Sequence, residues 1–173
     1  MIGLVLAVTI SLAGQAASPS ADRVPAHADA VRTETKHLTV ATSAPRRAVA
    51  PGTRLSLWID VTPKPSMHVY APAQKDFIPI SLSLANQAAV RPHVVQFPKP
   101  EQLFSTASQD TQLVYSKPFR IVQDVTVRAA AGATLTVKGA LKYQACDDSI
   151  CYAPVTVPVA WTVELKRPGK VTP

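Results

Sequence analysis

The residues of this chain whose type and spacing most directly indicate chemistry are its two cysteines, Cys146 and Cys151. They are the only cysteines in 173 residues, and four residues separate them. A thiol pair can form a disulfide, exchange with another disulfide or bind a soft metal ion. The elements that position the two sulfurs decide which of these reactions is available.

The sequences on both sides of the cysteine pair predict β-strands. Residues 133–143 and 155–165 are rich in β-branched and aromatic side chains, with apolar and polar residues alternating. A polar loop between two such runs predicts a β-hairpin. Facing residues in antiparallel strands have Cα atoms about 4.5 or 5.5 Å apart, inside the roughly 4.4–6.8 Å range of disulfides. We therefore expect that Cys146 and Cys151 can form a disulfide.

The spacing leaves two roles open for this disulfide. Closing so short a loop contributes only about 2 kcal/mol in the chain-entropy model, against nearly 5 kcal/mol for a loop of about a hundred residues. A structural crosslink would usually span more of the chain. An exported β domain with one cysteine pair nevertheless commonly carries an inert disulfide. Spacing alone does not separate a redox site from a crosslink.

Residues 143–154 resemble the cysteine motif of the N-terminal periplasmic domain of the DsbD thiol:disulfide interchange proteins. Residues 67–72 are similar to the aromatic strand early in that domain, and residues 113–119 to the segment entering its central strands. The resemblance extends over residues 46–166. The sequence departs from the family in having Ala153 where a second proline is common, and its loop is one residue shorter than in the best-known members.

The resemblance implies roles for particular residues. Cys151 would form the intermolecular disulfide with thioredoxin-fold partners, and Cys146 would resolve it. Phe104 would lie in a loop that caps the disulfide and shields it from stray oxidants and reductants, although an apolar anchor for a long loop is an equal alternative. The residues expected to shape the pocket are Tyr70, Phe104, Tyr143 and Tyr152.

The strand pattern predicts an all-β fold, an immunoglobulin-like antiparallel β-sandwich with one core. The 16 prolines oppose long helices. Residues 98–110 fit no strand and are predicted to form a long loop. The remaining predicted strands cover residues 36–41, 54–61, 67–70, 78–84, 93–97 and 119–128.

The chain divides into four predicted parts. Residues 1–17 carry no charge and contain a short apolar run, which indicates an export signal peptide. Residues 18–45 are predicted to be a disordered linker with a possible first strand near its end. Residues 46–166 form the domain, and residues 167–173 a tail. His27 and His37, in and just beyond the irregular part, are expected to be solvated rather than ligands.

The formal net charge of +7 and pI near 9.7 do not indicate nucleic-acid binding, because the basic residues are scattered and lack an aromatic platform. The excess charge favours solubility and weak attraction to anionic membrane lipids or acidic partners. A copper site involving Met67, His68 and the cysteines is a minor alternative, since soft sulfur and imidazole suit copper. The spacing does not fit a zinc site, and no cofactor is expected.

The sequence therefore predicts a periplasmic module that relays electrons through Cys146 and Cys151 between thioredoxin-fold proteins, as a protein-disulfide reductase or interchange component. Asp147 and Asp148 would raise the thiol pKa and make the pair slow unless a partner changes its surroundings, which suits a dedicated relay. Family members usually continue into a membrane-embedded domain, so we expect a membrane-embedded reductant to act on this protein in trans. The protein itself is expected to be a monomer. The alternative is a non-catalytic immunoglobulin-like binding module with a structural disulfide.

Overall fold

The computed structural model describes residues 31–75, 77–105 and 109–167. The predicted signal peptide, His27 and residues 168–173 of the predicted tail lie outside these residues. No helix in the described ranges is long and apolar enough to cross a membrane.

The described residues form twelve β-strands and no helix. The strands are β1 (Val31–Glu34), β2 (Leu38–Ser43), β3 (Arg54–Pro63), β4 (His68–Tyr70), β5 (Ser81–Leu84), β6 (Val90–Gln96), β7 (Glu101–Ser105), β8 (Asp110–Tyr115), β9 (Phe119–Val127), β10 (Thr134–Tyr143), β11 (Ala145–Cys146) and β12 (Val155–Glu164).

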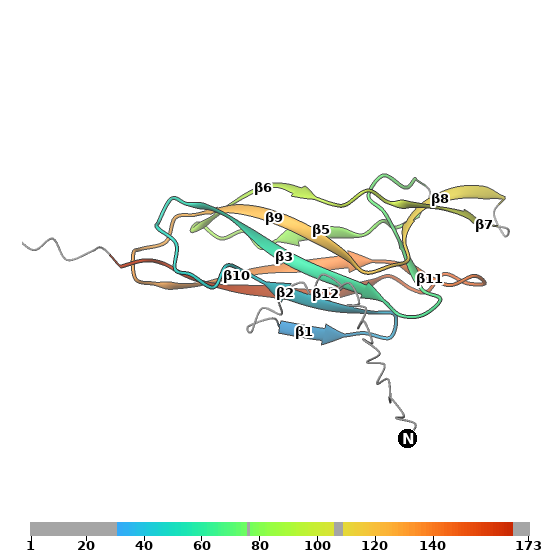
Figure 1. The fold of residues 1–173 in the computed structure, drawn as a ribbon, viewed down its shortest axis with the longest axis horizontal. Coiled ribbons are helices and arrows are strands. Elements are labelled where there is room, and N and C mark those ends of the chain that lie inside the picture. The colour runs from blue at the N-terminus through green and yellow to red at the C-terminus, as the bar shows by residue number, and fades with distance from the viewer. Residues whose placement is uncertain (1–30, 76, 106–108, 168–173) are drawn as a thin grey trace, which may run out of the picture.

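The strands assemble into three antiparallel sheets (Figure 1). One has five strands in the order β1-β2-β3-β9-β6, and a second has three in the order β12-β10-β5. The third has four strands in the order β11-β4-β8-β7. Figure 1 shows β7, β8 and β11 at the same end of the molecule. The predicted all-β, immunoglobulin-like sandwich is confirmed.

The core lies between the five-stranded and the three-stranded sheets. Along β3 every second side chain, from Leu55 to Val61, is at most 7% exposed, and β12 shows the same alternation. Period-2 burial is what a strand with one core-facing side requires. The indole nitrogen of Trp161 on β12 donates a 3.0 Å hydrogen bond to the carbonyl of Trp58 on β3, which links the two sheets.

The edges of the sheets carry prolines. β6 ends the five-stranded sheet, and its pairing with β9 shifts register between Pro92 and Val95. β12 ends the three-stranded sheet and contains Pro158, which lies opposite Ala140 of β10. Proline lacks a backbone donor and is tolerated at such edges.

The linker prediction is wrong for residues 31–34, which form β1. This strand pairs with β2 from Val31 opposite Thr42 to Glu34 opposite Thr39. The prediction that His37 is solvated is also wrong, since His37 is 6% exposed. The turn between β1 and β2 folds its ring onto the Tyr152 ring, with centroids 4.5 Å apart.

The predicted loop over residues 98–110 instead contains β7 and the start of β8. These strands form a hairpin whose register runs from Glu101 opposite Val114 to Ser105 opposite Asp110. The pattern is weak in the sequence because only Leu103 supplies an aliphatic side chain to the half-buried face of β7. The strand depends on its partner β8 more than on its own residues.

The predicted hairpin around the cysteines is present. β10 and β12 pair continuously from Thr134 opposite Glu164 to Tyr143 opposite Val155. Beyond this ladder the chain changes sheet, because β11 pairs with β4, with Cys146 opposite His68. The cysteine loop therefore lies where the three-stranded and four-stranded sheets meet.

Candidate redox site

Cys146 and Cys151 form a disulfide, with Cα atoms 4.0 Å apart. The two sulfur-bearing residues differ sharply in access. Cys146 is 1% exposed, whereas Cys151 is exposed to solvent. A reagent or protein approaching from solvent therefore meets Cys151 first.

Asp147 holds the loop between the cysteines in shape. Its carboxylate accepts hydrogen bonds from the backbone N–H groups of Ser149 and Ile150 and from the hydroxyl of Tyr152, each at 2.8 Å. The backbone hydrogen bonds, first that of Ile150, and the tyrosine hydroxyl together lower the pKa of Asp147. The carboxylate thus stays ionised, and the loop is ordered around a negative charge.

Tyr70 contacts the disulfide from β4. Its hydroxyl oxygen lies 3.4 Å from Cys146 Sγ and 3.5 Å from Cys151 Sγ. Disulfide sulfurs carry no proton, so the tyrosine hydroxyl is the donor in these weak contacts. Burial raises the pKa of Tyr70, which keeps the hydroxyl protonated.

A cavity of about 570 Å³ opens beside the disulfide. Both cysteines line it, together with Tyr70, Phe104 and His68. The structure thus brings two of the four predicted pocket residues, Tyr70 and Phe104, to the cysteines.

Phe104 shares this cavity but is 58% exposed. Among the described residues, neither of the two apolar clusters includes it. This exposure does not fit the alternative in which Phe104 anchors a loop to the core.

Two apolar residues that the sequence did not single out also lie at the disulfide. Phe77 and Leu103 contact the buried cluster of Tyr70, Val114 and Cys146, and both line the cavity. The Phe77 ring stacks on the Tyr70 ring with centroids 4.2 Å apart. No local motif marks these residues, because β4, β7 and β11 meet only in the folded sheet.

The other two predicted pocket residues, Tyr143 and Tyr152, are not part of the cavity lining. Tyr143 is fully buried in the main core, and its hydroxyl lies 2.8 Å from the Thr35 hydroxyl. Tyr152 binds Asp147, stacks on His37 and lies under the Lys36 ammonium group. Tyr152 thus supports the cysteine loop, whereas Tyr143 belongs to the main core.

His68 is a further residue at the site, and it is 6% exposed. Its Nε2 atom is enclosed and has no hydrogen-bond partner. Burial lowers the pKa of His68, while Asp148 and Asp147 act in the opposite direction. Within the part of the chain that the structure describes, no group of three or more His, Cys, Asp and Glu side chains is arranged to hold a metal ion. The copper alternative therefore gains no support from the geometry.

Comparison with protein families matches residues 36–161 to the family described as thiol:disulfide interchange protein DsbD, N-terminal. No curated protein matches the chain.

Solved structures with a similar fold have low sequence identity. The N-terminal periplasmic domain of ScsB from Proteus mirabilis aligns with a TM-score of 0.56 and 14% identity, over 83% of this chain and 53% of that chain. The DsbD N-terminal domain of Neisseria meningitidis in its reduced form aligns with a TM-score of 0.46 and 18% identity, over 68% of this chain and 82% of that chain.

Proposed function

The chain belongs to the family of DsbD N-terminal domains, and from this premise we propose that its Cys146–Cys151 pair relays electrons between thioredoxin-like partners. Family membership and the disulfide together support a thiol–disulfide exchange module. The relay role is more specific than an exchange module, because it assigns a separate task to each of the two sulfurs.

The observation that carries the proposal is the unequal access to the two cysteines. Exchange proceeds by attack of a thiolate on a disulfide through a mixed disulfide, so a relay needs one sulfur that a partner reaches and one that stays inside to resolve the intermediate. The exposed Cys151 suits the first task, and Cys146, at 1% exposure, suits the second.

The electrons balance in a two-step exchange. In the reduced domain the Cys151 thiolate attacks a partner disulfide, forming a mixed disulfide and releasing one partner thiolate. Cys146 Sγ then attacks Cys151 Sγ, so that the internal disulfide forms, the intermolecular bond breaks and the second partner sulfur leaves as a thiolate. The domain loses two electrons and the partner gains them.

The surroundings of Cys151 favour contact with another protein. Phe104 and Ile150 are 58% and 55% exposed, and both line the cavity that holds Cys151. Exposed apolar side chains at a hollow are typical of interaction sites. We propose that the active site of the partner docks at this cavity. The exchange takes place in the periplasm, and a membrane-embedded reductant supplies the electrons in trans.

The deciding experiment is the reduction potential of the Cys146–Cys151 couple. The purified domain is equilibrated in defined redox buffers, and free thiols are counted by mass tagging. A relay predicts a potential between about −270 and −180 mV, the range of known exchange proteins.

A potential well below about −300 mV would instead mark a structural disulfide. That outcome would overturn the relay and leave a non-catalytic binding module. The Cys146→Ala and Cys151→Ala variants are the controls, because neither can form the internal disulfide. Any change in their thiol count measures mixed disulfide with the buffer thiol and is subtracted.

A further inference from the structure

His68 lies directly opposite Cys146 in the pairing of β4 with β11, and both residues line the cavity. Opposite residues in antiparallel strands point to the same face, with Cβ atoms about 4.5–5.5 Å apart. Tyr70, two residues along β4, shares that face, and its ring centroid lies 5.8 Å from that of His68. An imidazole, a phenol and the buried sulfur therefore meet at one place.

The imidazole has an unused nitrogen at this place. His68 Nε2 is buried and has no hydrogen-bond partner while the disulfide is intact. Buried polar atoms without partners are rare in proteins and call for an explanation. Cys146 Sγ carries no proton in the disulfide, but it carries one after reduction. Reduction thus turns the sulfur on the strand opposite His68 into a thiol that can donate a hydrogen bond.

The buried thiol needs a proton acceptor before it can attack. The reactive form of cysteine is the thiolate, and at 1% exposure Cys146 has almost no contact with water. Burial and the carboxylates of Asp147 and Asp148 both oppose ionisation of a nearby thiol. Tyr70 stays protonated and can stabilise a thiolate by donating a hydrogen bond, but it cannot accept the proton.

His68 meets this need. Its pKa is lowered by burial, so the ring is neutral near pH 7 and carries a free lone pair. The titratable groups around it are Tyr70 on its own strand, Cys146 on β11, and Asp147 and Asp148 on the cysteine loop. The Gln112 side chain, from β8, lines the same cavity and is uncharged.

We propose that His68 exchanges a proton with Cys146 Sγ during disulfide exchange. This inference rests on the relay function and deepens it. When the mixed disulfide is resolved, His68 takes the Cys146 proton, the Cys146–Cys151 bond forms, and the electron pair of the broken bond leaves on the partner sulfur. In the reverse direction the partner thiolate attacks Cys151 Sγ, the internal bond breaks, and Cys146 Sγ leaves as a thiolate. His68 then takes a proton from solvent and passes it to Cys146 Sγ.

The test uses the reduced protein and a nitrobenzoate disulfide reagent that releases a coloured thiolate. Attack by the exposed Cys151 releases the first equivalent, and resolution by Cys146 releases the second. Stopped-flow absorbance over a range of pH separates the two phases. The second phase isolates the step assigned to His68 without any protein partner.

In the His68→Gln variant, glutamine can form hydrogen bonds but cannot take up the proton. General base catalysis contributes about 10²- to 10⁴-fold, so we expect the second phase to slow by about 100-fold at pH 7 and to lose the inflection that wild type shows near the histidine pKa. The first phase should be unchanged. His93→Gln is the matched control, since His93 lies on β6 and bonds the Thr126 hydroxyl, and it should leave both phases unchanged.

An unchanged second phase and pH profile in His68→Gln would overturn the proposal. Thermal unfolding checks that the variant is folded. A second measurement, the nitrogen chemical shifts of the histidine rings, uses the wild-type protein. The ring nitrogen chemical shifts of His68, but not of His93, should change when the disulfide is reduced; equal shifts in both states would also overturn it. A failure of the relay function would be distinguishable from this. The wild-type protein would then show the second phase with the nitrobenzoate reagent but no exchange with thioredoxin-like proteins.

Discussion

At the scale of single residues, the site separates the two cysteines by environment rather than by sequence. Cys151 faces solvent, while Cys146 is enclosed by Tyr70 and the neighbouring apolar side chains. The carboxylate of Asp147, at the start of the loop, accepts three hydrogen bonds, from Ser149, Ile150 and Tyr152. One residue thus orders the loop and contributes the negative charge that disfavours a thiolate.

This asymmetry predicts unequal trapping of a partner. Cys146→Ala leaves the exposed Cys151 to attack a partner disulfide with no sulfur to resolve the product, so the mixed disulfide should accumulate. Cys151→Ala leaves only the enclosed sulfur, and we expect at least about tenfold less mixed disulfide because exchange requires access to the attacking thiol. Non-reducing electrophoresis with a thioredoxin-fold protein that lacks its own resolving cysteine measures both.

Wild type is the control for this comparison, because it resolves the intermediate and should show little trapped complex. Equal amounts of complex with the two single-cysteine variants would contradict the assignment of Cys151 as the entry sulfur.

The residues of the cysteine loop could be predicted because they are neighbours in the chain. The hairpin and the disulfide depend on two adjacent strand patterns and a short polar loop. The position of His68 opposite Cys146 could not be predicted in the same way, since it depends on β4 pairing with β11, which lies far along the chain. Sequence spacing carries no direct information on that pairing.

At the scale of elements, β7 contributes two neighbouring residues, Leu103 and Phe104, to the cavity beside the disulfide. It was predicted as loop because it has a single aliphatic residue on its half-buried face. That residue, Leu103, packs on the cluster containing Cys146, while Phe104 lies at the cavity with most of its surface exposed. We therefore propose that these two neighbours share the shielding of the disulfide, a role for which the resemblance indicated only Phe104.

Truncating Leu103 should speed reduction of the disulfide by a small thiol such as dithiothreitol. If the lost shielding lowers the barrier by about 1 kcal/mol, the rate constant should rise about fivefold. Phe104→Ala should raise it as well if the exposed ring restricts access to Cys151. The rates are followed by quenched thiol alkylation.

Gln102→Ala is the matched control, since Gln102 is exposed on the same strand and does not line the cavity. Its rate should equal that of wild type. Leu103→Ala and Phe104→Ala rates that both match this control would show that β7 does not shield the disulfide.

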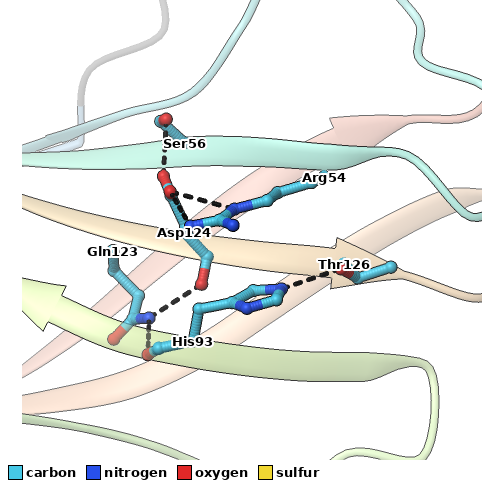
Figure 2. A network of polar contacts seen from close by, with 6 residues as sticks. All are labelled: Arg54, Ser56, His93, Gln123, Asp124 and Thr126. Atoms are coloured by element: carbon cyan, nitrogen blue, oxygen red, sulfur yellow. Dashed lines mark hydrogen bonds and ion pairs between the residues drawn. The ribbon is translucent and has the colours of Figure 1, made fainter.

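At the scale of the whole molecule, the site is carried by a sandwich whose five-stranded sheet is held by polar contacts away from the cysteines. Figure 2 shows Asp124 of β9 bonded to Arg54 and Ser56 of β3, and the Gln123 side chain bonded to the His93 carbonyl of β6. The contacts link three adjacent strands. The sandwich class and most strand positions were predictable from period-2 alternation, but this cross-strand register was not.

The Asp124 contacts predict an acid-sensitive part of the stability. Hydrogen bonds first from Ser56 and then from Arg54 lower the pKa of Asp124 below its usual value of 3.8. A carboxyl group with a depressed folded-state pKa stabilises the fold above its unfolded-state pKa, and this contribution is lost as the pH falls through the folded-state value. Asp124→Asn should therefore lower the free energy of unfolding by about 1.5 kcal/mol at pH 7, the lower end of the range for hydrogen bonds to a charged group.

The difference between wild type and Asp124→Asn should shrink as the pH falls below about 4, where the unfolded carboxyl group is protonated. Urea unfolding at several pH values measures it. Glu164→Gln, at an exposed position of β12, should change the unfolding free energy little at any pH. A constant gap between wild type and Asp124→Asn across the pH range would contradict the linkage.

The prolines on the sheet edges have a consequence for behaviour at high concentration. An open strand edge is a template on which another chain can add a strand, and growth of this kind leads to aggregates. Pro92 and the adjacent register shift interrupt the free edge of β6, and Pro158 removes a backbone donor from β12. Each sheet of the sandwich thus has one edge strand, β6 or β12, that is a poor template for intermolecular β-sheet growth, and fibril growth from these two edges is disfavoured.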